Sequence, residues 1–308
     1  MTLNICWNNI IESALREIEE LSQRSVNVIR EHEEPVQNSI FAELQLQEPP
    51  IAVGSAKTVH RAKWHCDDVA VLTVHGGGSD YVQPAELQSL SEHPGLTRVR
   101  HICKSPEGNV VIVTEFAPMG SLDKVLRDLR GEKGRTISNQ TLVQCAIQVC
   151  AGMERLVEEC LLHKNLSLHN VLVFDFHPDD PQRVRVKVAD YWFEGGSAYS
   201  LGELALPFRW MAPESLTRRR WSEMSIVWSF GVLMWEMWSE EAAPYSSLSS
   251  AEEVASLIGR GDRLPKPEGC PEDIYGLMQL CWERSPARRP GFRQLSEDLR
   301  RMSGEIPA

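Results

Sequence analysis

The sequence has no CxxC pair, no internal repeat and no apolar run long enough to cross a bilayer. Its eight cysteines are scattered without metal-site spacing, which suits small buried side chains in a reducing compartment. The amino terminus lacks the basic start and long apolar core of a signal peptide, and the most apolar stretch, IVWSFGVLMW, is too short for a membrane span. We therefore expect a soluble, intracellular, cytoplasmic protein.

Basic residues are also scarce relative to acidic ones. Lys and Arg total 32 against 43 Asp and Glu, which gives the 308-residue chain a net charge of −11. This balance argues against a nucleic-acid groove or a face for anionic membranes. The length suffices for one large domain or for two lobes around a shared cleft.

The N-terminal segment contains neither Gly nor Pro from residue 7 to residue 34. Apolar residues recur there at helical spacing, which predicts an amphipathic helix within residues 1–36 that ends before Pro35. Such a helix either packs on the rest of the chain or forms a coiled-coil seam with a partner. The repeat is short and imperfect, and this favours packing.

Beyond this segment, short β-rich runs come first and long helical patterns follow. The β-rich runs that predict strands are 41–47, 57–64, 68–74 and 109–116. A glycine-rich connection at 76–80 leads into a short helix candidate at 81–90. The clearest helices follow later, at 141–159, 225–239 and 271–285. Strands followed by helices predict an α+β fold with two unlike lobes.

Five short motifs in the helical half follow a fixed order. They are HKNLSLHN at 163–170, VKVADYW at 186–192, LPFRWMAPESL at 206–216, WSFGVLMWE at 228–236 and SPARRPGF at 285–292. They resemble the catalytic loop, the strand ending in DFG, the APE segment and two late helical motifs of protein kinases. WMAPES and the pair CW at 281–282 are most similar to tyrosine kinases and the tyrosine-kinase-like group. The resemblance implies a bilobal kinase fold, with an N-lobe over 37–117 and a C-lobe over 118–304.

The nucleotide-binding parts of this resemblance are altered. The glycine-rich loop matches IAVGSAKTVHRA, in which Gly54 is kept while Ala52 and Lys57 fill the other two glycine positions. Leu72 stands in place of the third-strand lysine and cannot pair with a phosphate. Lys57 is similar to the relocated lysine of the with-no-lysine kinases and is a candidate to reach into the cleft. The alternative is a solvated lysine at a strand edge.

An adenine slot is also implied by the resemblance. Apolar walls with backbone polar groups suit a purine, although ordinary core residues of the same fold would fill these positions too. The slot would be formed by Val59 and Ala70 above, Leu172 below, Thr114 as a small gatekeeper, and the backbones of Glu115 and Ala117 at the hinge.

The catalytic loop lacks its acid. Asn165 occupies the position of the catalytic base, and a neutral amide cannot accept a hydroxyl proton at neutral pH. Loss of a general base costs on the order of 10²–10⁴-fold in rate. His163 is expected to be a core residue, whereas Asn170 and Asp190 are the candidate magnesium ligands.

Other positions of the kinase pattern are changed or kept. Trp192 replaces the glycine of DFG, and we expect it to hold the segment in one conformation and to crowd the metal site. Ile226 replaces an aspartate that caps the catalytic-loop backbone. The remaining candidates are Glu86 as the helix glutamate, Glu214 and Arg289 as a buried ion pair, and Tyr199 as a phosphorylation site.

Three functions are compatible with this pattern. The first is a pseudokinase that signals by binding nucleotide, protein partners or both. The second is an active or weakly active ATP-dependent kinase, for Ser/Thr or Tyr, that uses Lys57 with Mg²⁺ at Asn170 and Asp190. The third is an assembly module with an empty cleft. The departures at 72, 165, 192 and 226 affect the chemistry and spare the scaffold, which favours the first.

Overall fold

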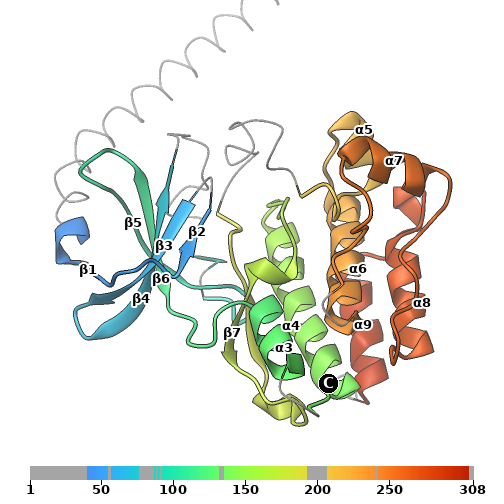
Figure 1. Cartoon of the computed structure of the whole chain (residues 1–308), viewed down its shortest axis with the longest axis horizontal. Coiled ribbons are helices and arrows are strands. Elements are labelled where there is room, and N and C mark those ends of the chain that lie inside the picture. Colours follow the sequence, from blue (N-terminus) through green and yellow to red (C-terminus); the bar gives the residue numbers. More distant parts are fainter. Residues whose placement is uncertain are drawn as a thin grey trace, which may run out of the picture.

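The computed structural model describes residues 40–54, 57–75, 87, 89–90, 92–131, 135–192, 207–239 and 242–304. Over these ranges a sheet-rich part reaches to Glu115 and a helix-rich part begins at Leu122. The two parts stand side by side and are joined by residues 116–121 (Figure 1). The predicted bilobal α+β fold is therefore confirmed.

The N-terminal part is an antiparallel sheet. Its strands run in the spatial order β1-β3-β4-β6-β5, and β2 also pairs with β3. They are β1 (Gln45–Leu46), β2 (Ala52–Val53), β3 (Lys57–Trp64), β4 (Asp67–Val74), β5 (Val99–Lys104) and β6 (Val110–Glu115). The predicted strands at 57–64, 68–74 and 109–116 correspond to β3, β4 and β6.

One strand prediction in this part needs correction, and strand β5 was not predicted. Residues 40–43 form a helical turn, so the strand predicted at 41–47 is limited to β1. Phe41 and Leu44 lie three residues apart and pack on the same apolar cluster, a spacing that suits a helical turn better than a strand. The sequence did not predict β5, whose alternation is interrupted by a register shift between Val99 and His101.

The C-terminal part consists of helices and one small sheet, β7 (Val171–Asp175) paired with β8 (Arg185–Val188). Among the residues that the structure describes, three single 3-10 turns lie between longer elements: η1 (Leu168–Asn170), η2 (Pro181–Arg183) and η4 (Pro286–Arg288). The described helices are α3 (Leu122–Gly131), α4 (Asn139–Glu158), α5 (Pro213–Arg218), α6 (Glu223–Trp238), α7 (Ala251–Gly259), α8 (Glu272–Cys281) and α9 (Phe292–Ser303).

Local sequence explains where the main helices begin. Ser138 caps α4 by accepting from the Thr141 N–H, and Ser222 forms a reciprocal capping box with Ser225 at the start of α6. α6 is apolar on all sides and is buried among the other helices of the lobe. Figure 1 shows it between α4 and α8.

A close backbone approach attaches the segment before β5 to the helical lobe. A Cβ on Gly152 of α4 would lie 2.5 Å from the Gly95 carbonyl oxygen, so only glycine fits there. The Val188 N–H donates to Gly95 O, and the Thr97 N–H donates to Val188 O, each at 2.8 Å. The start of β5 is therefore held against the end of β8, where the site begins.

Within the described residues, none of the helices combines the length and the apolar character that a bilayer span requires. The predicted N-terminal helix at 1–36 lies outside these residues, as do Glu86 and Tyr199.

Candidate functional site

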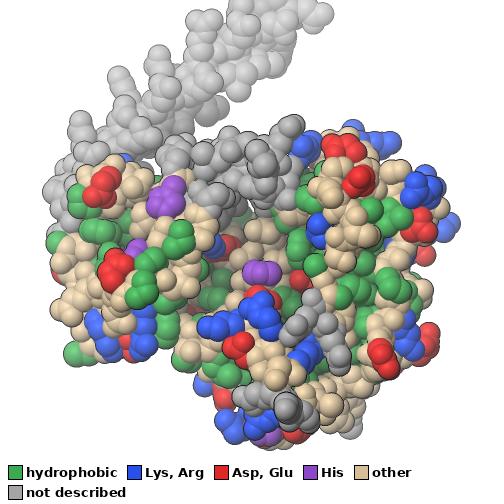
Figure 2. Space-filling model, viewed as in Figure 1, with side chains coloured by type: hydrophobic (Ala, Val, Ile, Leu, Met, Phe, Trp, Pro, Cys, Tyr) green, Lys and Arg blue, Asp and Glu red, His purple; other side chains and the backbone are tan. Residues whose placement is uncertain are grey.

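The site is built on the loop 163–170 and the end of β8. Figure 2 shows a recess between the two lobes. His163 is buried, and its Nε2 lies 2.8 Å from the Ala189 carbonyl oxygen. The Asn165 N–H donates to Nδ1 at 3.3 Å, so Nε2 carries the proton. Burial lowers the pKa of His163, and the ring is a neutral structural group.

A second hydrogen bond closes the loop on itself. The Asn170 side-chain amide donates to the Asn165 backbone oxygen at 2.7 Å. The Ala189 N–H donates to the Asn170 carbonyl oxygen at 2.8 Å, so Ala189 is bound to the loop through both of its backbone groups. The next residue, Asp190, is thereby placed beside the loop. The loop keeps its backbone geometry although its acid is replaced by Asn165.

Lys57 reaches this carboxylate from the other lobe. Its ammonium forms a direct ion pair with Asp190 Oδ2, and the two side chains are 29% and 11% exposed. Asp190 has a backbone φ of 62°, a left-handed conformation that Asp and Asn adopt more readily than most residues. The ion pair joins β3 to the C-lobe across 133 residues of sequence.

Strand register explains how a lysine at position 57 can replace one at position 72. Val59 lies opposite Leu72, and Lys57 lies opposite Val74. Alternation puts Lys57 and Leu72 on the same face of the sheet, about 7 Å apart along the strand direction. Leu72 is 5% exposed and belongs to the hydrophobic core. The apolar core therefore occupies the usual lysine position, and the charge enters from the neighbouring strand.

The two aromatic residues after Asp190 are part of the core. The Tyr191 hydroxyl donates to the Thr97 carbonyl oxygen at 2.7 Å, and its ring centroid lies 5.2 Å from that of Trp192. Trp192 is 1% exposed. That Trp192 holds the segment in one conformation is a prediction that these contacts do not test. That it crowds a metal site remains a prediction.

The slot residues line the connection between the lobes. Thr114 is buried and its hydroxyl donates to the Glu115 carbonyl oxygen at 3.2 Å. The Glu115 N–H donates to Arg98 O at 3.0 Å, so this N–H is not available to a ligand. Ala70 pairs with Thr114, Ala117 follows at the hinge, and Val59 and Leu172 are partly buried against the core. Gly54 donates its N–H to Lys57 O at 2.9 Å.

Sequence reasoning missed the side chain of Glu115. One carboxylate oxygen accepts from Lys187 Nζ at 2.6 Å and from the Arg98 N–H at 2.7 Å. Lys187 lies on β8, and Asp190 follows two residues after the end of that strand. This ion pair therefore ties the hinge to the strand that leads to Asp190. An acid at the hinge with a lysine on a strand 72 residues later gives no local signal of the contact.

Glu214 and Arg289 form a bidentate ion pair, with distances of 2.6 Å and 3.0 Å. The Arg289 side chain is fully enclosed, and it also donates to Met224 O and Glu283 O. Its guanidinium lies 5.1 Å from the Trp228 ring centroid. Ile226 lies two residues before Trp228, near the start of α6, and is completely buried. This cluster joins α5, α6 and the turn before α9.

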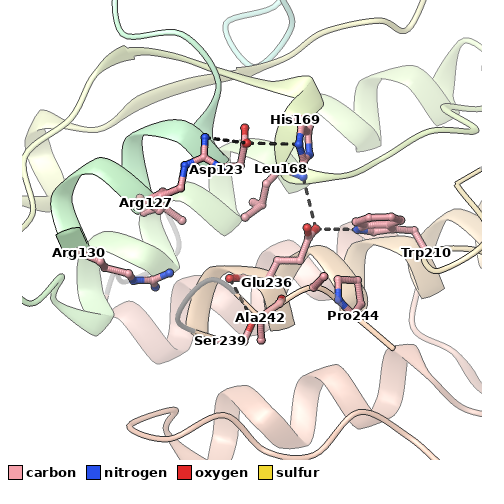
Figure 3. Close-up of a pocket in the computed structure, with 12 residues that line it drawn as sticks. Asp123, Arg127, Arg130, Leu168, His169, Trp210, Glu236, Ser239, Ala242 and Pro244 are labelled. Carbon is pink, nitrogen blue, oxygen red and sulfur yellow. Dashed lines mark hydrogen bonds and ion pairs between the residues drawn. The ribbon is translucent and has the colours of Figure 1, made fainter. Parts of the chain in front are cut away.

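A cavity of about 250 Å³ lies between α3, η1 and the end of α6 (Figure 3). Glu236 points into it from α6. Its carboxylate accepts from Trp210 Nε1 at 2.7 Å and, at 3.5 Å, from the Leu168 N–H. Both donors are neutral, and burial raises the pKa of Glu236 to about 8. Nearby, Asp123 Oδ2 lies 3.3 Å from His169 Nε2.

Glu236 was also missed from the sequence. A signal was present, because α6 is apolar on every side, so an acid near its end is set among buried neighbours. The acid that approaches the loop backbone in this structure is therefore Glu236, ten residues after the position that Ile226 occupies.

Asp190 and Asn170 are the oxygen donors that the site offers to a cation. Magnesium is held by one or two carboxylates together with substrate phosphates. Here Asp190 Oδ2 is taken by Lys57, and no cluster of three or more His, Cys, Asp or Glu side chains occurs in the part of the chain that the structure describes. The donor set does not fit a resident cation while Lys57 holds Asp190.

Comparison with known proteins agrees with this geometry. Residues 48–299 match the family model described as protein tyrosine and serine/threonine kinase. The chain is 39% identical over 222 residues to the mouse megakaryocyte-associated tyrosine-protein kinase, covering 72% of this chain and 41% of that protein. It is 35% identical over 268 residues to the tyrosine-protein kinase Btk of Drosophila melanogaster, covering 83% and 32%.

A third relative is the transforming protein Fps of avian sarcoma virus strain PRCII, a tyrosine-protein kinase that is 34% identical over 224 residues, covering 71% of this chain and 40% of that protein. The chain thus spans less than half the length of these relatives. Protein kinase domains in general bind ATP with Mg²⁺. A bilobal fold, the ordered motifs and a match over most of the sequence show that this chain belongs to the protein tyrosine and serine/threonine kinase family.

Proposed function

We propose that this chain is a pseudokinase, which binds a nucleotide, a protein partner or both and signals through its conformation with little or no phosphoryl transfer. The observation that carries the proposal is Asn165 at the position of the base, in a loop whose backbone hydrogen bonds are intact. The loop is therefore well formed and lacks a proton acceptor. Such a loss lowers the rate by about 10²–10⁴-fold.

Nucleotide binding is supported by Lys57 and the hinge. Lys57 carries its charge to Asp190 from the face on which Leu72 stands, so a cation is still available to phosphates. A purine would use the second lone pair of the Glu115 carbonyl, which also accepts from the Thr114 hydroxyl, and the Ala117 N–H. Apolar walls with a few polar backbone groups are the usual form of such a pocket.

Thermal unfolding with ATP and MgCl₂ tests nucleotide binding. A ligand at 100 times its Kd stabilises the fold by about 2.7 kcal/mol, and millimolar ATP should therefore raise the Tm. Lys57→Ala should reduce this shift. Lys63→Ala is the matched control, because Lys63 lies on the same strand and pairs with Asp68 at the surface. Unchanged melting at millimolar ATP would leave the assembly module with an empty cleft as the better function.

Phosphoryl transfer is tested separately with labelled ATP, the chain itself and peptide pools containing Ser, Thr and Tyr. We expect no time-dependent incorporation. The contact between Lys57 and Asp190 favours a second function, a weak kinase with a relocated lysine, because transfer depends on positioning and charge as well as on a base. Robust incorporation that disappears in Asp190→Ala would establish that function and overturn the pseudokinase.

A further inference from the structure

We propose that Lys57 takes the place of a divalent cation at Asp190, so that this chain holds a nucleoside triphosphate without requiring Mg²⁺. This inference rests on the nucleotide binding proposed above and specifies the form of the ligand. Its basis is the direct contact between the Lys57 ammonium and Asp190 Oδ2.

The carboxylate of Asp190 already has a cation bound to it. Asp190 is 11% exposed, and its Oδ2 is already bound to a cation supplied by the protein. A magnesium ion needs oxygen ligands at short, nearly octahedral geometry, so it would have to displace Lys57 before it could use this oxygen. The neighbouring Asn170 has its amide nitrogen committed to the Asn165 backbone, which leaves one neutral oxygen.

The side chains expected near the phosphates carry less negative charge in this chain than in other kinases. Kinases place two aspartates and one lysine near the phosphates, a summed charge of about −1 that Mg²⁺ helps to offset. In this chain the base position is the neutral Asn165, so Lys57 and Asp190 sum to zero. His163 adds no charge, because its buried ring is neutral. The phosphates therefore meet less negative charge, and the need for a divalent cation falls.

The Lys57 ammonium has enough hydrogen-bond donors to serve two partners. An ammonium has three N–H donors, so Lys57 can donate to Asp190 and to a phosphate oxygen together. The Gly54 N–H donates to Lys57 O at 2.9 Å, which ties the backbone of Lys57 to Gly54. Lys57 is 29% exposed, which leaves part of its side chain open to a ligand.

Calorimetric titration of the full chain with ATP, in EDTA and in MgCl₂, tests the proposal. We expect the Kd in EDTA to stay within about threefold of the value in MgCl₂. Lys57→Ala should weaken binding in EDTA by at least about tenfold, while Lys63→Ala should not change it. Melting without nucleotide checks that each variant is folded.

Asp190→Asn gives the decisive comparison, because Asn also tolerates the left-handed backbone at this position. If Lys57 is the counter-ion, removing the carboxylate frees the ammonium, and ATP should bind in EDTA as tightly as to wild type or more tightly. If a metal mediates binding, Asp190→Asn should bind ATP in MgCl₂ more weakly than wild type does. Binding that appears only with MgCl₂ would overturn this inference and keep the proposed nucleotide site. Absence of binding in both buffers would overturn both.

Discussion

Glu236→Gln is expected to remove a pH dependence of stability that the buried carboxyl causes. Burial raises the pKa of Glu236 in the folded chain to about 8, above the ordinary value of 4.5 that applies when the chain is unfolded. The protonated carboxyl therefore stabilises the fold fully below pH 4.5, and this contribution is lost as the pH rises towards 8. Gln has no proton to lose and can still accept from Trp210 Nε1.

The size of the effect follows from the two pKa values. Each pKa unit corresponds to about 1.36 kcal/mol, and the unfolded carboxyl is already ionised above pH 6. Between about pH 6 and pH 8 the wild type should lose about 2 kcal/mol of unfolding free energy through this group. That corresponds to about 3–6 °C in Tm for a chain of this size.

Urea unfolding of both chains at pH 6, 7 and 8 measures the difference. All other titrating groups, including His163, are shared and cancel when the two curves are subtracted. The stability of the variant should rise relative to wild type as the pH increases. Parallel curves across this range would show that Glu236 ionises normally, and the account of a neutral acid in the cavity would then be refuted.

Three further substitutions have defined outcomes. Arg289→Met should cost about 3–5 kcal/mol of unfolding free energy in urea, because it leaves Glu214 without its partner; a loss below about 1 kcal/mol would contradict the ion pair's structural role. Tyr191→Phe should lower stability by about 1 kcal/mol in thermal melts through the lost hydroxyl bond, and an unchanged Tm would contradict that bond. Leu72→Lys should destabilise the fold by at least about 3 kcal/mol, because it buries an ammonium in the core. A stable Leu72→Lys chain with tighter ATP binding, measured by calorimetry, would contradict this.

Much of the fold followed from local patterns. The long strands β3, β4 and β6 and the helices α4, α6 and α8 were predictable from the length, periodicity and apolar character of their runs. The helical turn at 40–43 and strand β5 were not, since tertiary packing and a bulge override their short patterns. The site was predictable where chemistry depends on residue type, as at Asn165.

The sequence by itself determined which chemical groups the site possesses: an amide in place of a base, a leucine in place of a lysine, and a lysine in the loop before it. The identities of side chains decide what they can donate or accept, whatever the fold. Only the tertiary structure decided that Lys57 contacts Asp190, that Glu115 binds Lys187, and that Glu236 accepts from Trp210. These contacts join residues far apart in sequence, so they depend on strand register and on how α6 is buried.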